Sequence, residues 1–460
     1  MSLTWADVKE AVHGGRRDYT EGSLSTAITL LAIPMVLEMI MESLFAIVDV
    51  FWVSRLGSDA VATVGLTEGI LTTVFAIAMG LSFSTTAFVA RRIGEHDTEG
   101  AAKGAVQAIF IGLFISVILG FIGIVFGADL LRLMGAEAGV LKNATYTRII
   151  LGGSIVVVYL FLLNAVFRGA GDAAISMRVL LLANGINLVL NPLLIFGIGP
   201  FPAMGVMGSA VGTLVGRGCG VAYQFWALTS GRSRIHIVAS QFTFDFPLMW
   251  RLFRISLNGM LQILISTASW TGMARIAATF GSPALAGYTL AIRVIIFSIL
   301  PSWGFCNAAA TLVGQCLGAK KPERAEAAVW TAGKINSVFL SSLALFYIIF
   351  AERVLGIFSS DPHVISVGSD CLRFICYAYP LVGFGMTMMQ AFNGAGDTRT
   401  PTLVNFVAFW VIQIPLAWTL SQKTALAERG LFIGIFVAQC AVALMSLYLF
   451  KRGRWKQQKI

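Results

Sequence analysis

Three carboxylates lie in one apolar segment near the start of the chain, where charged side chains are rare. They are Glu38, Glu42 and Asp49, in the run 25–53. In a helix, Glu42 lies about 40° and Asp49 about 20° from Glu38, so all three face one narrow stripe. An acid within a membrane is unfavourable unless it faces a cavity or a partner, and such residues mark ion pathways. The stripe therefore indicates a binding site for H⁺ or Na⁺.

A fourth acid, Glu68, belongs to the next apolar run. Its distance from the turn at Gly57 places it between Glu42 and Asp49 in depth. Carboxylates that are crowded in a medium of low dielectric hold protons more tightly, so at least one of the four should exchange a proton near neutral pH. We predict cation coupling centred on Asp49. For Asp49, a helix-end carboxylate that reaches water is the alternative.

Polar residues on two later runs are predicted to complete this site. Asn187 and Asn191 are four residues apart and share a helix face. With Ser209 and Thr213 they are expected to form a polar pocket for substrate; hydrogen bonding that only holds helices together is equally compatible with the pattern. Pro34 removes a backbone hydrogen bond from the first run and permits a bend there, either static or linked to protonation.

The elements that carry these residues are predicted to be membrane-spanning helices. Of the 460 residues, 57% are hydrophobic and 12% are charged, whereas soluble domains carry about 25% charged residues. Apolar runs of spanning length predict an all-α membrane protein with twelve helices, near 25–53, 59–90, 101–126, 143–167, 176–198, 205–228, 254–279, 284–316, 327–350, 370–392, 402–420 and 430–450.

The second six helices repeat the first six. Three motifs recur at offsets of 224 or 225 residues, aligning Gly57 with Gly281, Gly94 with Gly318, and Asp172 with Asp397. Six helices per half keep both halves in one orientation, so the lobes should be related by a pseudo-two-fold axis along the membrane normal, with the binding site between them. The predicted parts are a tail (1–24), an N-lobe (25–228), a linker (229–253), a C-lobe (254–450) and a second tail (451–460).

The net charge of +10 is explained by the distribution of Lys and Arg over the loops, which indicates the membrane topology. It gives no reason to expect a nucleic-acid partner. With the N-terminus inside, the loops on that side hold about 21 Lys and Arg residues, Arg168 among them, and the opposite side holds about 6. Both termini are therefore expected in the cytoplasm, with the chain crossing the cell membrane many times and the lipid bilayer as its surroundings.

Enzyme, metal and nucleotide sites are not predicted. No histidine falls in the spans, the cysteines form no C-x-x-C pair, and no G-x-x-x-x-G-K-[ST] motif is present. The two Gly-Ala-Gly-Asp segments follow membrane helices, so their glycine is expected to end a helix and their Asp to cap the next one. We expect no cofactor apart from the coupling ion.

The C-terminal half lacks the acids of the N-terminal half. Met273 stands where the repeat places Asp49. Arg275 and Arg293 lie in its spans, and a run rich in aromatic and methionine residues is predicted either to line an adaptable apolar wall or simply to pack; it contains Phe384, Met386, Met388, Met389 and Phe392.

Several of these segments resemble the MATE (multidrug and toxic compound extrusion) family. The resemblance rests on Ile33-Pro-Met-Val-Leu-Glu, on Val48-Asp-Val-Phe-Trp-Val-Ser-Arg-Leu-Gly, and on the Ala-Arg-Arg-Ile-Gly and Phe-Arg-Gly-Ala-Gly-Asp motifs. It covers about residues 24–450 and is strongest to the DinF-like branch. It implies two six-helix lobes forming a V, and antiport of small organic, often cationic, compounds against H⁺ or Na⁺.

Residue by residue, the resemblance matches Asp49 to the family's coupling aspartate, Pro34 to its bending proline and Asn187 to its fifth-helix asparagine. Asn191 stands where some members carry a second aspartate, so Glu38, Glu42 or Glu68 is expected to take over part of that role. A flippase for a lipid-linked precursor is the alternative function, which Arg275 and Arg293 would suit. We expect the protein to act as a monomer.

Overall fold

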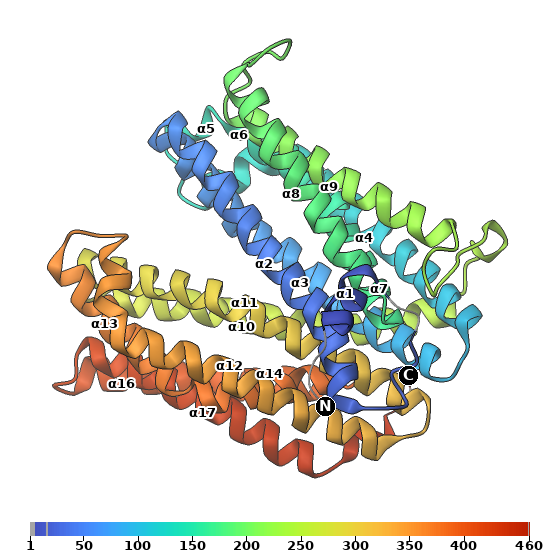
Figure 1. Ribbon diagram of the computed structural model, residues 1–460. Coiled ribbons are helices and arrows are strands. Elements are labelled where there is room, and N and C mark those ends of the chain that lie inside the picture. Colours follow the sequence, from blue (N-terminus) through green and yellow to red (C-terminus); the bar gives the residue numbers. More distant parts are fainter. Residues whose placement is uncertain (1–4, 15–16, 459) are drawn as a thin grey trace.

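The chain folds into two helical lobes that diverge from a common end, like the arms of a V (Figure 1). The structure is a computed structural model, and it describes residues 5–14, 17–458 and 460. The helices of the N-lobe are α2 (Leu24–Val53), α3 (Ser58–Gly94), α4 (Thr98–Leu133), α5 (Ala138–Leu141), α6 (Ala144–Gly152), α7 (Ser154–Ala170), α8 (Ala173–Phe196) and α9 (Val206–Thr229).

The C-lobe repeats this order. Its helices are α10 (Phe246–Ala278), α11 (Ser282–Gly318), α12 (Pro322–Gly356), α13 (Pro362–Tyr377), α14 (Tyr379–Gly394), α15 (Arg399–Asn405), the π-helix η3 (Phe406–Gln413), α16 (Ile414–Lys423) and α17 (Glu428–Lys451).

The twelve predicted spans correspond to these helices. Within the described residues, nine helical segments are long and apolar enough to cross a membrane, and α6 with α7 forms a tenth that is bent by 40°. The remaining two spans are α9 and α10, whose glycines and polar residues lower their mean hydropathy. The prediction of an all-α, two-lobe membrane fold is confirmed.

The sequence repeat is a repeat of backbone geometry. Helices α3 and α11 each contain 37 residues. Gly57, before α3, has φ 101° and ψ 175°, and Gly281, before α11, has φ 96° and ψ 173°. Because L-residues rarely adopt such positive φ values, glycine is required at both turns.

The lobes meet through paired glycines at the closed end of the V. A Cβ atom at Gly94 would lie 2.0 Å from the carbonyl oxygen of Gln315, and one at Gly318 would lie 2.1 Å from that of Arg91. These two contacts are equivalent under the repeat. The lobes therefore approach backbone to backbone at this inter-lobe contact, and the C-terminus lies near it (Figure 1).

The segment between the lobes is shorter than the predicted linker 229–253. Helix α10 begins at Phe246, because the side chain of Asp245 accepts a hydrogen bond from the backbone N–H of Leu248 at 3.0 Å and a proline follows in the first turn. The connection is thus 230–245, and its start is held by Asp172, whose Oδ2 accepts from the N–H of Arg234 at 2.6 Å.

The segment predicted as an N-terminal tail is bound to both lobes. It contains helix α1 (Trp5–His13), and Arg178 of α8 donates to the carbonyls of Val12 and His13. Residues 17–23, the N-terminal strap, pass beneath the C-lobe, where Arg324 of α12 donates to the carbonyls of Tyr19, Glu21 and Gly22 at 3.1, 2.8 and 2.9 Å. The strap therefore joins the lobes at their closed end.

Replacing Arg324 with Ala should release the strap and speed tryptic cleavage after Arg17 by about tenfold, because cleavage requires local opening of the segment. The measurement is limited proteolysis followed by mass spectrometry. Arg353→Ala, an exposed position on the same helix, is the matched control. Equal cleavage rates in the two variants would show that Arg324 does not hold the strap.

Candidate functional site

Asp49 of α2 is the centre of a buried polar cluster and is 8% exposed. Its Oδ1 accepts hydrogen bonds from Asn191 Nδ2 at 2.9 Å, Ser209 Oγ at 2.8 Å and Thr213 Oγ1 at 3.4 Å. Asn187 Nδ2 donates to Thr213 Oγ1 at 3.2 Å. The structure thus brings all four predicted pocket residues together, around the acid.

Glycines on α9 allow α8 and α9 to pack closely enough to form this cluster. A Cβ atom at Gly208 would lie 2.6 Å from the backbone of Leu194, and one at Gly212 would lie 2.3 Å from Asn191 Oδ1. Small residues permit such close approach of membrane helices. The low hydropathy of α9 is therefore a consequence of how it positions the cluster.

Replacing Gly212 with Ala should displace Asn191 from Asp49 and lower coupled transport by about tenfold, equivalent to about 1.4 kcal/mol. Transport by purified protein in liposomes is the measurement. Gly218→Ala is the matched control, because Gly218 lies on the same helix with no atom within 4 Å of the added Cβ. Unchanged transport in Gly212→Ala would show that the spacing of α8 and α9 does not matter.

Glu42 is held by Arg217, a residue that sequence analysis missed. Arg217 Nη2 lies 2.8 Å from Glu42 Oε1, and the guanidinium lies over the ring of Phe45 at 4.5 Å. Arg217 is 6% exposed. It follows Ser209 and Thr213 at the same four-residue spacing on α9, and this spacing is the signal that could have identified it.

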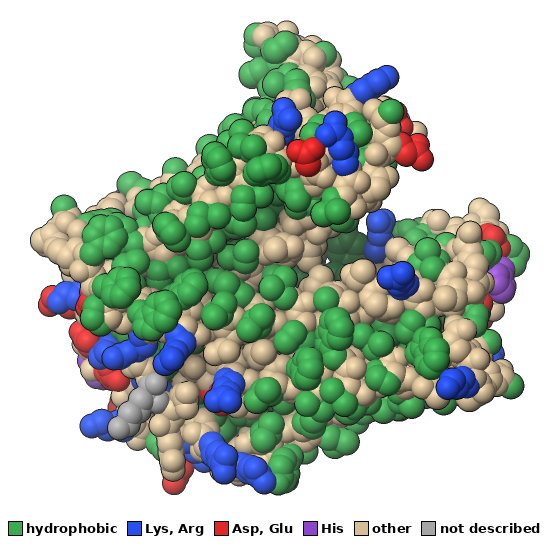
Figure 2. Space-filling model, turned by 180° about the vertical axis from the view of Figure 1, so that it is seen from behind, with side chains coloured by type: hydrophobic (Ala, Val, Ile, Leu, Met, Phe, Trp, Pro, Cys, Tyr) green, Lys and Arg blue, Asp and Glu red, His purple; other side chains and the backbone are tan. Residues whose placement is uncertain are grey.

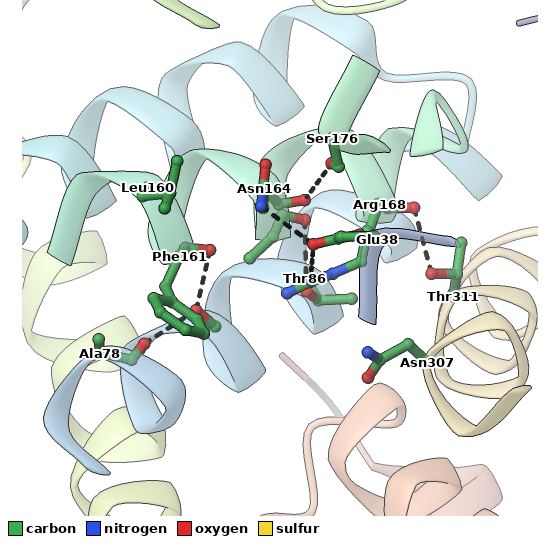
Figure 3. Close-up of polar contacts among 12 residues, drawn as sticks. Glu38, Ala78, Thr86, Leu160, Phe161, Asn164, Arg168, Ser176, Asn307 and Thr311 are labelled. Atoms are coloured by element: carbon green, nitrogen blue, oxygen red, sulfur yellow. Dashed lines mark hydrogen bonds and ion pairs between the residues drawn. The ribbon is translucent and has the colours of Figure 1, made fainter. Parts of the chain in front are cut away.

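Glu38 belongs to a second buried cluster, one turn beyond Pro34 (Figure 3). Its Oε1 lies 2.7 Å from Arg168 Nη1 and accepts a hydrogen bond from Asn164 Nδ2 at 3.0 Å. Glu38 is 1% and Arg168 7% exposed. The prediction that Arg168 is a cytoplasmic loop charge is therefore wrong: Arg168 lies in the last turn of α7, inside the lobe, where Glu38 compensates its charge.

The predicted stripe of acids exists, but its three acids on α2 are bound by different partners. From Glu38 to Asp49 a helix rises about 16 Å, and each acid on α2 meets different partners along this length. Glu68 of α3 is exposed and is close enough to interact electrostatically with both Asp49 and Arg293 of the C-lobe. The site is therefore three separate carboxylate environments on α2, with Glu68 on the side facing the other lobe.

The C-lobe has its own buried polar network, which the sequence analysis did not anticipate. Asn336 of α12 accepts from Ser302 Oγ at 2.7 Å and donates to the carbonyl of Gly383 at 3.1 Å. Of the residues predicted to line an apolar wall, Met388 and Phe392 are instead buried, in a hydrophobic cluster that includes Trp455. For these two residues, packing is the observed role.

Arg275 and Arg293 are both exposed, and within the described part of the chain neither forms an ion pair at 4 Å or less.

The two Gly-Ala-Gly-Asp segments differ from each other. Asp397 accepts from the N–H of Thr400 at 3.1 Å, as a helix cap does, whereas Asp172 binds Ser233 and the connection between the lobes. Asp172 occupies the N-cap position of α8 without a side-chain cap bond, and the N-cap residue of α15 is Thr398, so each Asp fulfils only part of the capping prediction.

Known proteins match this chain along most of its length. The family model MatE matches residues 34–193 and 258–419, one stretch in each lobe. A probable multidrug resistance protein NorM of Thermotoga maritima is 25% identical, with 94% of this chain and 93% of that protein covered. A FAD transporter of Shewanella oneidensis is 25% identical, with 89% and 90% covered.

A solved structure has the same fold. It is described as an outward-facing conformation of a multidrug resistance MATE family transporter of the MOP superfamily. It superposes with a TM-score of 0.88 at 28% identity, covering 96% of this chain and 98% of that one.

Proposed function

The chain belongs to the MatE family of membrane transporters, and we propose that it exports small organic molecules in exchange for H⁺ or Na⁺ bound at Asp49. The observation that carries this proposal is the convergence of three neutral donors on one oxygen of Asp49. Such donors stabilise the ionised carboxylate but leave its charge available to a proton or a cation. Relatives named as multidrug resistance proteins support the substrate class.

The balance of charge in the N-lobe supports a one-for-one exchange. Glu42 is paired with Arg217 and Glu38 with Arg168, so of the three acids on α2 it is Asp49 that has no ion pair among the described residues. A cationic substrate and a proton or Na⁺ would compete for the charge of Asp49. Binding of the ion on one side of the membrane then drives release of the substrate there, because a ligand shifts the equilibrium only through its different affinity for the two states.

The direction of transport follows from the charge distribution. Lys and Arg side chains gather at the closed end of the V (Figure 2). Lys321 and Arg324 bond the N-terminal strap there, and Lys456 pairs with Glu326 near the start of α12. By the positive-inside rule this end is cytoplasmic. Both termini then lie inside the cell and the V opens outward, so a substrate released from it leaves the cell. We propose that the functional unit is a monomer.

The test is efflux of a cationic dye from liposomes containing the purified protein, with a pH gradient and a Na⁺ gradient imposed separately. We expect dye movement against its gradient under at least one of them, and the effective gradient identifies the ion. Dye movement that is independent of both gradients would contradict antiport.

A second candidate function is the translocation of an anionic amphiphile, such as a lipid-linked precursor. It is supported by Arg275 and Arg293 in the C-lobe, by the hollow between the lobes, which has basic side chains at its edge (Figure 2), and by the FAD transporter among the relatives. Binding of FAD or a lipid diphosphate that Arg275→Gln and Arg293→Gln weaken, together with absent dye efflux, would favour this function over the first.

A further inference from the structure

One turn of α7 is bonded to both lobes at once (Figure 3). The side chain of Arg168 pairs with Glu38 of α2 at 2.7 Å. The backbone carbonyl of the same Arg168 accepts a hydrogen bond from Thr311 of α11 at 3.1 Å, and the next carbonyl, Gly169, accepts from Gln315 Nε2 at 3.0 Å. Arg168 thus links α2 to the C-lobe. Its side chain pairs with α2, and its backbone carbonyl accepts a hydrogen bond from α11.

The α2 side of this junction is anchored next to the break in the helix. Pro34 leaves one backbone carbonyl of α2 without its helical donor, and Glu38 lies one turn later. Asn164, which also binds Glu38, is held by Gln224 at 2.6 Å. Among the residues that the structure describes, the second carboxylate oxygen of Glu38 is buried with no hydrogen-bond partner. Glu38 is therefore held through one oxygen by Asn164 and Arg168, both of α7.

Between Pro34 and Glu38, helix α2 also contacts the C-lobe directly. A Cβ atom at Gly304 of α11 would lie 2.6 Å from the backbone of Val36. Helices α2, α7 and α11 thus each contact the other two near the inter-lobe contact. A bend of α2 at Pro34 would move Glu38 relative to Arg168, and the position of α7 then could not stay unchanged.

We propose that Arg168 is a positioning residue through which α2 controls the inter-lobe contact. The ion pair with Glu38 holds the last turn of α7 where its carbonyls accept Thr311 and Gln315, and so stabilises the state closed at the cytoplasmic end. Separation of the lobes at that end requires this ion pair to break. The inference rests on the proposed function only in assuming that the lobes separate there during transport.

The test measures how often the contact opens. Ser256 of α10 is 0% exposed and bonds Ser84 of the other lobe at 2.6 Å, so Ser256→Cys reacts with a hydrophilic maleimide only when the lobes part. Site-resolved mass spectrometry separates this label from the native cysteines. We expect Arg168→Gln and Glu38→Gln each to raise the labelling rate about tenfold, and the double variant to add little, since both remove one coupling.

Arg217→Gln is the matched control, because it breaks the other buried ion pair of α2, and its helix α9 packs mainly against α8, α7 and α6 of the N-lobe. An unchanged rate in Arg168→Gln and Glu38→Gln, or an equal rise in Arg217→Gln, would overturn the inference. If Arg168→Gln does not fold, Glu38→Gln, which retains the shape of the side chain, decides alone. Labelling needs no ion gradient or substrate, so this inference and the role of Asp49 fail independently.

Discussion

Replacing Asp49 with Asn should abolish ion-coupled export, with a loss of at least about 100-fold, or about 2.7 kcal/mol. Asn has the same shape but cannot be protonated or hold a cation by charge. The side chain can still bond Ser209 and Asn191, and removing a buried charge does not destabilise the lobe. The protein should therefore insert and fold as the wild type does.

Transport against a gradient in liposomes, with the folded fraction measured on the same samples, checks this expectation. Asp129→Asn is the matched control, because the side chain of Asp129 is 60% exposed and pairs with Arg132 on its own helix. Substrate exchange without a gradient can persist in the Asp49 variant. Uphill transport at the wild-type rate would remove Asp49 from the coupling mechanism.

Replacing Arg217 with Met should destabilise the N-lobe by about 2 kcal/mol. Breaking a buried ion pair costs about 3–5 kcal/mol, but the Glu42 side chain is 20% exposed and can regain some water. The stacking of Arg217 over Phe45 is lost as well. Because the pair acts as a unit, the double variant Glu42→Gln, Arg217→Met should recover most of the loss.

Unfolding in a mild detergent, followed by thermal or denaturant titration, measures this effect. Arg373→Met is the comparison, since its ion-pair partner Glu352 is 66% exposed and Arg373 itself 30%, and pairs near the surface contribute about 0–1 kcal/mol. Equal stabilities of the two variants, or a double variant no more stable than Arg217→Met, would mean that the Glu42–Arg217 pair does not stabilise the N-lobe.

Much of the fold was predictable because it depends on local patterns. The motifs around Gly57 and Gly281 predicted equivalent turns, and the backbone angles agree within a few degrees. The α2 stripe of Glu38, Glu42 and Asp49 followed from helix geometry alone. What each acid contacts did not, because helical periodicity gives the face of a residue and not its neighbour.

The partners of these acids illustrate the limit. Arg168 lies at the end of its apolar run, so the sequence pattern indicates a loop charge. Only the packing of α2 against α7 shows that it pairs with Glu38. Arg217 lies in the middle of a glycine-rich run whose pairing with α8 depends on close contacts such as that of Gly212 with Asn191. Predicting the ion pairs required the packing of helices that are more than a hundred residues apart in the chain.

The most direct measurement of the central claim is ion release on substrate binding. Purified protein in a weakly buffered detergent solution is mixed with a cationic dye, and the H⁺ or Na⁺ released is compared with the dye bound. If Asp49 is the shared site, the wild type should release about one ion per dye molecule, and Asp49→Asn should release none. Equal release from both proteins would contradict the assignment of coupling to Asp49.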